Sequence, residues 1–180
     1  MKKLFFCFLL FAISSTSYAE NKPVDSINPN IELVFSPNFR LDLPVEFFNF
    51  TKIASADDIL IKFQNGSYLS FKAIDRVDEG LDPLFDLRLY PEFILGLRKP
   101  DSSSNETNSQ FIKSLNAYKH RLGNFQVTID EFNNKVVYLA KGDQESVAFA
   151  INKHNVEQIL VINFTNIDDK KIYTTLKGLR

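Results

Sequence analysis

Alternation between hydrophobic and polar residues, which is the pattern of a half-buried β-strand, first appears near the start of the chain. Residues 31–35 and 39–43 are the first two strand candidates, and in the second of them Phe39, Leu41 and Leu43 alternate with polar residues. A stronger signal covers residues 59–74, where Asn65 and Gly66 separate two alternating runs. This pair is typical of a type I′ turn, because both central positions of that turn need a positive φ. We therefore expect an antiparallel hairpin over 59–74.

The alternation returns in the second half of the chain. Four strands separated by short polar turns are predicted over residues 125–132, 135–141, 145–152 and 156–164. In the last of these, Leu160, Ile162 and Phe164 occupy one face, while Ile159 and Val161 occupy the other. A strand that is apolar on both faces needs a covering layer on each side of its sheet.

Two further segments have hydrophobic residues at helical spacing. The longer one covers residues 104–122, and Ser103 and Glu106 have the spacing of a capping box at its start. Residues 168–180 form a shorter amphipathic segment. Strands, an irregular segment, a helix, four strands and a terminal helix predict one α+β domain over residues 31–180, with an antiparallel sheet covered by helices.

The segment Pro83–Pro100, PLFDLRLYPEFILGLRKP, follows neither period throughout. Pro91 suits the first position of a short helix, because its missing N–H costs nothing there. We expect the Phe93 side of this helix to pack on the sheet and the residues before Pro91 to be extended or only loosely helical. Three hydrophobic residues of that extended part are the candidate partner-binding residues: Phe85, Leu87 and Leu89.

The first nineteen residues have the order of a secretory signal peptide. Lys2 and Lys3 precede an apolar run over 4–13, and small residues lead up to Ala19. We therefore expect residues 1–19 to be removed, with export to the periplasm or the medium. Cys7 lies inside the apolar run, and no small residue precedes it, so a lipid anchor is not expected.

The exported chain begins with a polar leader over residues 20–30 and contains no cysteine. Without Lys2 and Lys3, 19 basic residues stand against 22 acidic ones, which gives a net charge of −3. No basic stripe is visible along the sequence, which disfavours nucleic acid and anionic membranes as partners.

The sequence contains no arrangement that is typical of an enzyme. His120 is expected to point away from the apolar side of its helix and His154 to lie in a turn, so neither has the neighbours of a zinc site. There is no Gly-x-Ser-x-Gly and no phosphate-binding glycine loop. The acidic segment 75–82 is a poor match to a calcium loop, and a solvated loop is the favoured interpretation. We expect no catalytic residues, no metal and no cofactor.

The segment LDLPVEFF, followed by a hairpin, a central helix, four strands and a terminal helix, resembles the PsbP-like fold of bacterial envelope proteins of the DcrB type. The resemblance covers most of residues 31–180 and consists of pattern rather than signature residues. It implies a three-layer α/β/α sandwich and binding or accessory roles without catalysis.

Two functions follow as hypotheses. The first is an exported, non-enzymatic protein-binding module, such as an inhibitor or an immunity protein that acts on an envelope toxin or enzyme. The alternative is a periplasmic accessory protein that holds a small apolar ligand or lipid between sheet and helix, which would use the many phenylalanines.

Overall fold

The computed structural model describes residues 30–48, 51–55, 58–99 and 105–180. The predicted signal peptide (1–19) and all but the last residue of the predicted leader (20–30) lie outside the described residues.

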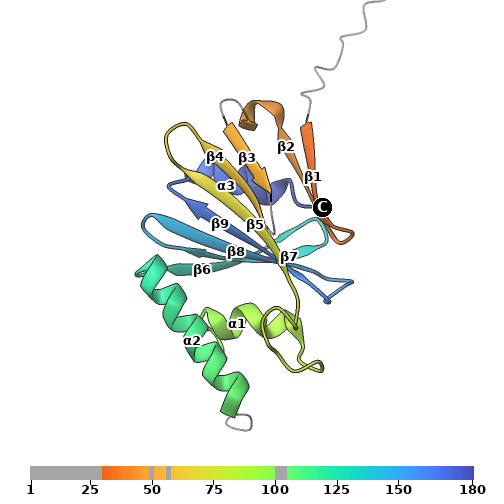
Figure 1. Ribbon diagram of the computed structural model, residues 1–180, viewed down its shortest axis with the longest axis vertical. Coiled ribbons are helices and arrows are strands. Elements are labelled where there is room, and N and C mark those ends of the chain that lie inside the picture. Colours follow the sequence, from red (N-terminus) through yellow and green to blue (C-terminus); the bar gives the residue numbers. More distant parts are fainter. Residues whose placement is uncertain (1–29, 49–50, 56–57, 100–104) are drawn as a thin grey trace, which may run out of the picture.

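A seven-stranded sheet forms the centre of the molecule (Figure 1). In spatial order its strands are β3 (Thr51–Ser55), β4 (Ile59–Phe63), β5 (Tyr68–Ile74), β9 (Ile159–Thr165), β8 (Glu145–Asn152), β7 (Lys135–Lys141) and β6 (Gln126–Phe132). Every neighbouring pair is antiparallel. The predicted hairpin and the predicted four-strand meander are both confirmed, and β5 joins them by pairing with β9.

The turn between β4 and β5 differs from the type I′ turn that was predicted. Only Gly66 has a positive φ, of +83°, and Asn65 does not. The backbone N–H of Phe63 donates to the carbonyl of Ser67 at 2.9 Å, which closes a three-residue loop. Asn65 contributes through its side chain, whose Oδ1 accepts from the backbone N–H of Ser67 at 3.1 Å.

One face of the sheet, called the helix face below, carries two helices. They are α1 (Tyr90–Ile94), which follows the single 3-10 turn η2 (Leu87–Leu89), and α2 (Asn105–Leu122). Aromatic rings join α2 to the sheet and the two helices to each other. The Tyr118 ring of α2 lies edge-on to Phe149 of β8, with centroids 5.6 Å apart, and Phe93 of α1 stacks on Phe111 of α2 at 4.7 Å. This packing places α2 over the β8 side of the sheet.

The opposite face is covered mainly by a second sheet of two strands. They are β1 (Asn30–Ser36) and β2 (Phe39–Pro44), followed by the 3-10 turn η1 (Val45–Phe48), and α3 (Asp169–Lys177) completes the layer. The alternating side chains of β2, Phe39, Leu41 and Leu43, have no exposed surface. A Cβ on Gly178 would lie 2.1 Å from the carbonyl oxygen of Asp42, so only glycine lets the end of α3 approach β2 this closely.

The prediction of an α+β domain with an antiparallel sheet covered by helices was wrong, and so was the implied α/β/α sandwich. Strands make up 43% of the structure and helices 26%, so the chain is more β-rich than either description. The reason lies in residues 31–43. Their strands form a separate hairpin that covers the central sheet, in the place where a helical layer was expected.

Strand β9 confirms the prediction of a strand with two buried faces. Leu160, Ile162 and Phe164 pack into the core under β1, β2 and α3. Ile159 and Val161 pack into the core under α1 and α2. The two layers that the sequence required are therefore present, although one of them consists largely of strands.

Of the three candidate partner-binding residues, Leu87 lies in the core with residues of α1 and Phe85 packs against that core, while Leu89 is half-buried. Leu87 has 0% of its surface exposed, so it offers nothing for a partner to contact. Phe85 and Leu89 are partly buried, and the Phe85 ring lies 5.4 Å from the Phe111 ring. Phe85 and Leu87 turn inward because they pack in one hydrophobic cluster with Tyr90 and Ile94 of α1.

We expect Leu87→Ala to lower the free energy of unfolding by about 2–5 kcal/mol, because it leaves a cavity in a packed core. Leu84→Ala is the matched control, since Leu84 is 94% exposed; it should change stability by no more than about 0.5 kcal/mol. Urea unfolding of both variants measures the difference. Equal stability would place Leu87 on the surface.

Candidate functional site

Half of the helix face is left open. Figure 1 shows α1 and α2 on the side of β6, β7 and β8, away from β3 and β4. The pairing of β5 with β9 shows which side chains point to this open area. Lys72 of β5 pairs with Val161 of β9, whose side chain lies on the helix face, so Lys72 lies on that face too. Every second residue of a strand shares a face, so Tyr68 and Ser70 also lie there. Lys62 pairs with Tyr68, and Lys52 pairs with Lys62. Side chains of β3, β4 and β5 therefore share an uncovered surface.

Three lysines, one from each of these strands, occupy this surface: Lys52, Lys62 and Lys72. All three are exposed, and none forms an ion pair with another of the described residues. Lys52 and Lys62 stand directly opposite each other, which is unfavourable for like charges on neighbouring strands. We call the three lysines, with Tyr68 and Ser70, the lysine face.

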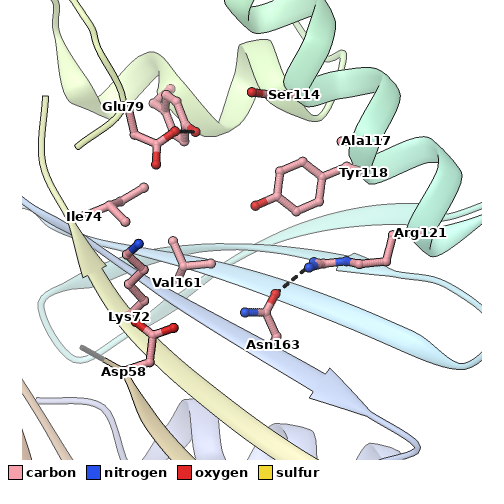
Figure 2. A pocket seen from close by; sticks show the side chains of 11 residues that line it. Asp58, Lys72, Ile74, Glu79, Ser114, Ala117, Tyr118, Arg121, Val161 and Asn163 are labelled. Carbon is pink, nitrogen blue, oxygen red and sulfur yellow. Dashed lines mark hydrogen bonds between the residues drawn. The ribbon is translucent and has the colours of Figure 1, made fainter. Parts of the chain in front are cut away.

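A cavity of about 330 Å³ lies where the lysine face meets α2 (Figure 2). Its floor comes from β5 and β9, which contribute Lys72, Ile74, Val161 and Asn163. Its roof comes from α1 and α2 and from the loop after β5. The volume lies at the small end of the range for ligand pockets.

A hydrogen bond between Tyr90 and Glu79 closes one end of the cavity. The Tyr90 hydroxyl donates to Oε2 of Glu79, and the Gln110 amide donates to the Glu79 carbonyl. Burial, helped by the neighbouring Glu79 carboxylate, raises the pKa of Tyr90 well above its usual range. The phenol therefore remains a proton donor at neutral pH, and it holds Glu79 in place.

Arg121 of α2 lies at the other end. Its Nη2 donates to Oδ1 of Asn163 at 2.8 Å, and its Nε lies 3.1 Å from Oε2 of Glu145. The guanidinium also sits over the Tyr118 ring, 5.0 Å from the centroid. Asn163 in turn donates to Ser70 at 3.0 Å. Arg121 is thus fixed, and Glu145 already balances its charge.

Two donors point into the cavity without an acceptor among the described residues. Figure 2 shows the Lys72 ammonium rising from the floor and the Tyr118 hydroxyl entering from α2. Burial is the main cause that raises the pKa of Tyr118, so its hydroxyl keeps its proton at neutral pH. The cavity therefore offers hydrogen bonds to a ligand.

This arrangement is suited to binding. Both phenols are stabilised in the protonated form, which is the opposite of what a tyrosine base needs. His120 and His154 are exposed and do not line the cavity. In the described part of the chain, no group of three or more His, Asp or Glu side chains could hold a metal ion, and no helix is long and apolar enough to cross a membrane.

The acidic segment 75–82 acts as a turn that caps its own backbone. Asp75 Oδ1 accepts from the backbone N–H groups of Val77 and Asp78 at 2.7 and 2.9 Å, and Asp82 accepts from Leu84 at 2.7 Å. The Glu79 side chain does not cap this turn: its carboxylate accepts the hydrogen bond from Tyr90 and lines the cavity.

The sequence analysis missed both the lysine face and the cavity. The lysines are ten residues apart in the chain, which is neither a helical nor a strand period, and only the pairing of three strands brings them together. The Asn65-Gly66 turn was a usable signal, because it fixes the register of β4 against β5 and so sets Lys62 opposite Tyr68.

Comparison with known proteins gives no relative: no family model matches the chain, and no curated protein matches it. The resemblance to PsbP-like proteins therefore stays a prediction.

The pKa of Tyr90 leads to a prediction at alkaline pH. A buried phenol keeps its proton while the unfolded chain loses it above about pH 10, so stability is lost as pH rises through that region. We expect Tyr90→Phe to reduce this loss in the free energy of unfolding by up to about 1.4 kcal/mol per pH unit. Urea unfolding between pH 9 and 11 measures it, with Tyr173→Phe on α3 as the control. Equal slopes in wild type and Tyr90→Phe would contradict the burial of this phenol.

Proposed function

We propose that this chain is an exported, non-enzymatic protein-binding module that recognises an acidic surface of another envelope or secreted protein through the lysine face. An inhibitor or immunity protein that acts on an envelope toxin or enzyme fits this description. The observation that carries the proposal is the direct opposition of Lys52 and Lys62 on an uncovered sheet surface, without a carboxylate partner among the described residues.

Charge supports this choice of partner. The exported chain is acidic overall, so three lysines gathered on one face are a local reversal of its charge. Carboxylates on a partner would relieve the repulsion between Lys52 and Lys62 and would speed encounter by attraction at long range. The half-buried ring of Tyr68 and the half-buried side chain of Leu60 lie on the same face and supply the apolar contact that protein interfaces need.

The alternative, a small apolar ligand or lipid held between sheet and helix, is less well supported. The cavity in that position is lined by Lys72, Glu79 and Arg121 as well as by two phenols. None of the described phenylalanines lines it; Phe93 and Phe111, for example, stack on each other between the two helices instead. A purely apolar molecule would leave these polar groups without partners.

Affinity capture from an envelope extract tests the proposal. Wild-type protein is expected to recover a specific acidic partner that is released as salt is raised, because exposed charges are screened by salt. The variant Lys52→Glu/Lys62→Glu is expected to lose that partner. Lys170→Glu is the matched control, since Lys170 is an exposed lysine on α3, behind the opposite face of the sheet.

Circular dichroism and urea unfolding establish that the double variant is folded. Recovery of the same partner by wild type and by the double variant would contradict the proposal, and so would the absence of any specific partner. Recovery of nucleic acid or anionic lipid in place of a protein would also overturn it.

A further inference from the structure

The cavity presents opposite charges at separate places. The Lys72 ammonium and the Tyr118 hydroxyl point into it as donors that have no acceptor among the described residues (Figure 2). Glu79 faces the same space with its carboxylate, of which Oε2 accepts the hydrogen bond from Tyr90. The carboxylate has lone pairs beyond that one bond, so it can accept from a ligand as well.

The floor between these groups is apolar. Ile74 and Val161 line the cavity and are 3% and 6% exposed, so their side chains form a closed surface. Arg121 adds no net charge to the cavity, because Glu145 lies against it at 3.1 Å. Lys72 is therefore the cation that remains for a ligand. Two carboxylates line the cavity, those of Asp58 and Glu79. Figure 2 shows Asp58 near the base of Lys72 and Glu79 on the opposite, upper side, so Glu79 is the anion across the cavity from the floor.

We propose that the cavity binds a small zwitterion, in which a carboxylate and an ammonium group are joined by a short apolar chain. The ligand carboxylate accepts hydrogen bonds from Lys72 and Tyr118. The ligand ammonium donates to Glu79, and the chain between them lies on Ile74 and Val161.

Each charged group of the ligand complements one charged residue of the cavity. A simple anion would meet the Glu79 carboxylate, and a simple amine would meet the Lys72 ammonium, so each would suffer one repulsion that the zwitterion avoids. The volume of about 330 Å³ limits the ligand to a small molecule. Lys72 belongs both to the lysine face and to the cavity, but Lys52 and Lys62 do not line the cavity, so changes at those two lysines test the docking surface alone.

Isothermal titration with a set of simple compounds tests the inference. The probes are glycine, 4-aminobutanoate and 6-aminohexanoate, with butanoate as the carboxylate control and butylamine as the amine control. We expect one of the three zwitterions to bind about tenfold or more tightly than both controls, because a hydrogen bond to a charged group contributes about that much.

Two variants test which residue binds each charged group of the ligand. Tyr118→Phe is expected to weaken the zwitterion about tenfold, whereas Tyr173→Phe on α3 leaves it unchanged. Glu79→Gln keeps an acceptor for Tyr90 but removes the charge. It should therefore weaken the zwitterion and strengthen butanoate, so that selectivity between the two is lost.

Several results would overturn the inference. These are no binding of any zwitterion at millimolar concentration, binding of butanoate to the wild type as tight as that of the tightest zwitterion, or unchanged selectivity in Glu79→Gln. Because Lys52→Glu/Lys62→Glu leaves the cavity intact, loss of partner capture with unchanged zwitterion binding separates this site from the docking surface.

Discussion

The pairing of β5 with β9 is the constraint on which the rest of the structure depends. It joins residues 68–74 to residues 159–165 in continuous register and so unites the early hairpin and the late meander in one sheet. The chain between β5 and β6 must then cross β9, β8 and β7 to reach the far edge. Helices α1 and α2 lie in that crossing, so they cover one half of the helix face. The strands β3 and β4 lie on the other side of β5 and remain open.

This topology gives the open surface its chemistry. On an exposed sheet face that has no partner, we expect a positive side chain on one strand to stand opposite a negative one on the next, because opposite charges on neighbouring strands attract. Here Lys52 faces Lys62, and Lys72 follows on β5, so the surface costs the isolated protein some stability. Such a cost is understandable where a partner supplies the missing carboxylates. The cavity lies at the border between the open and covered halves, where buried phenols meet an exposed lysine.

Local patterns predicted the elements of this fold but not its layers. The strands of the meander, the hairpin of residues 59–74 and the two long helices follow from periodicity and turn residues. Which element covers which face depends on contacts between distant residues, such as those that set Gly178 against Asp42. The same limit explains Leu87: its apolar character was evident, but only the position of α1 decides that it is buried. The cavity residues come from five separate segments of the chain, so no continuous sequence motif could have predicted the cavity.

The central claim is that the lysine face is occupied by a partner in the envelope. Acylation of lysines with an amine-reactive reagent, applied to the producing cells and to the purified protein, measures this directly by mass spectrometry. The account predicts that Lys52 and Lys62 react less in cells than in the purified protein, whereas Lys170 on α3 reacts equally in both. Equal reactivity of all three lysines in the two settings would contradict it.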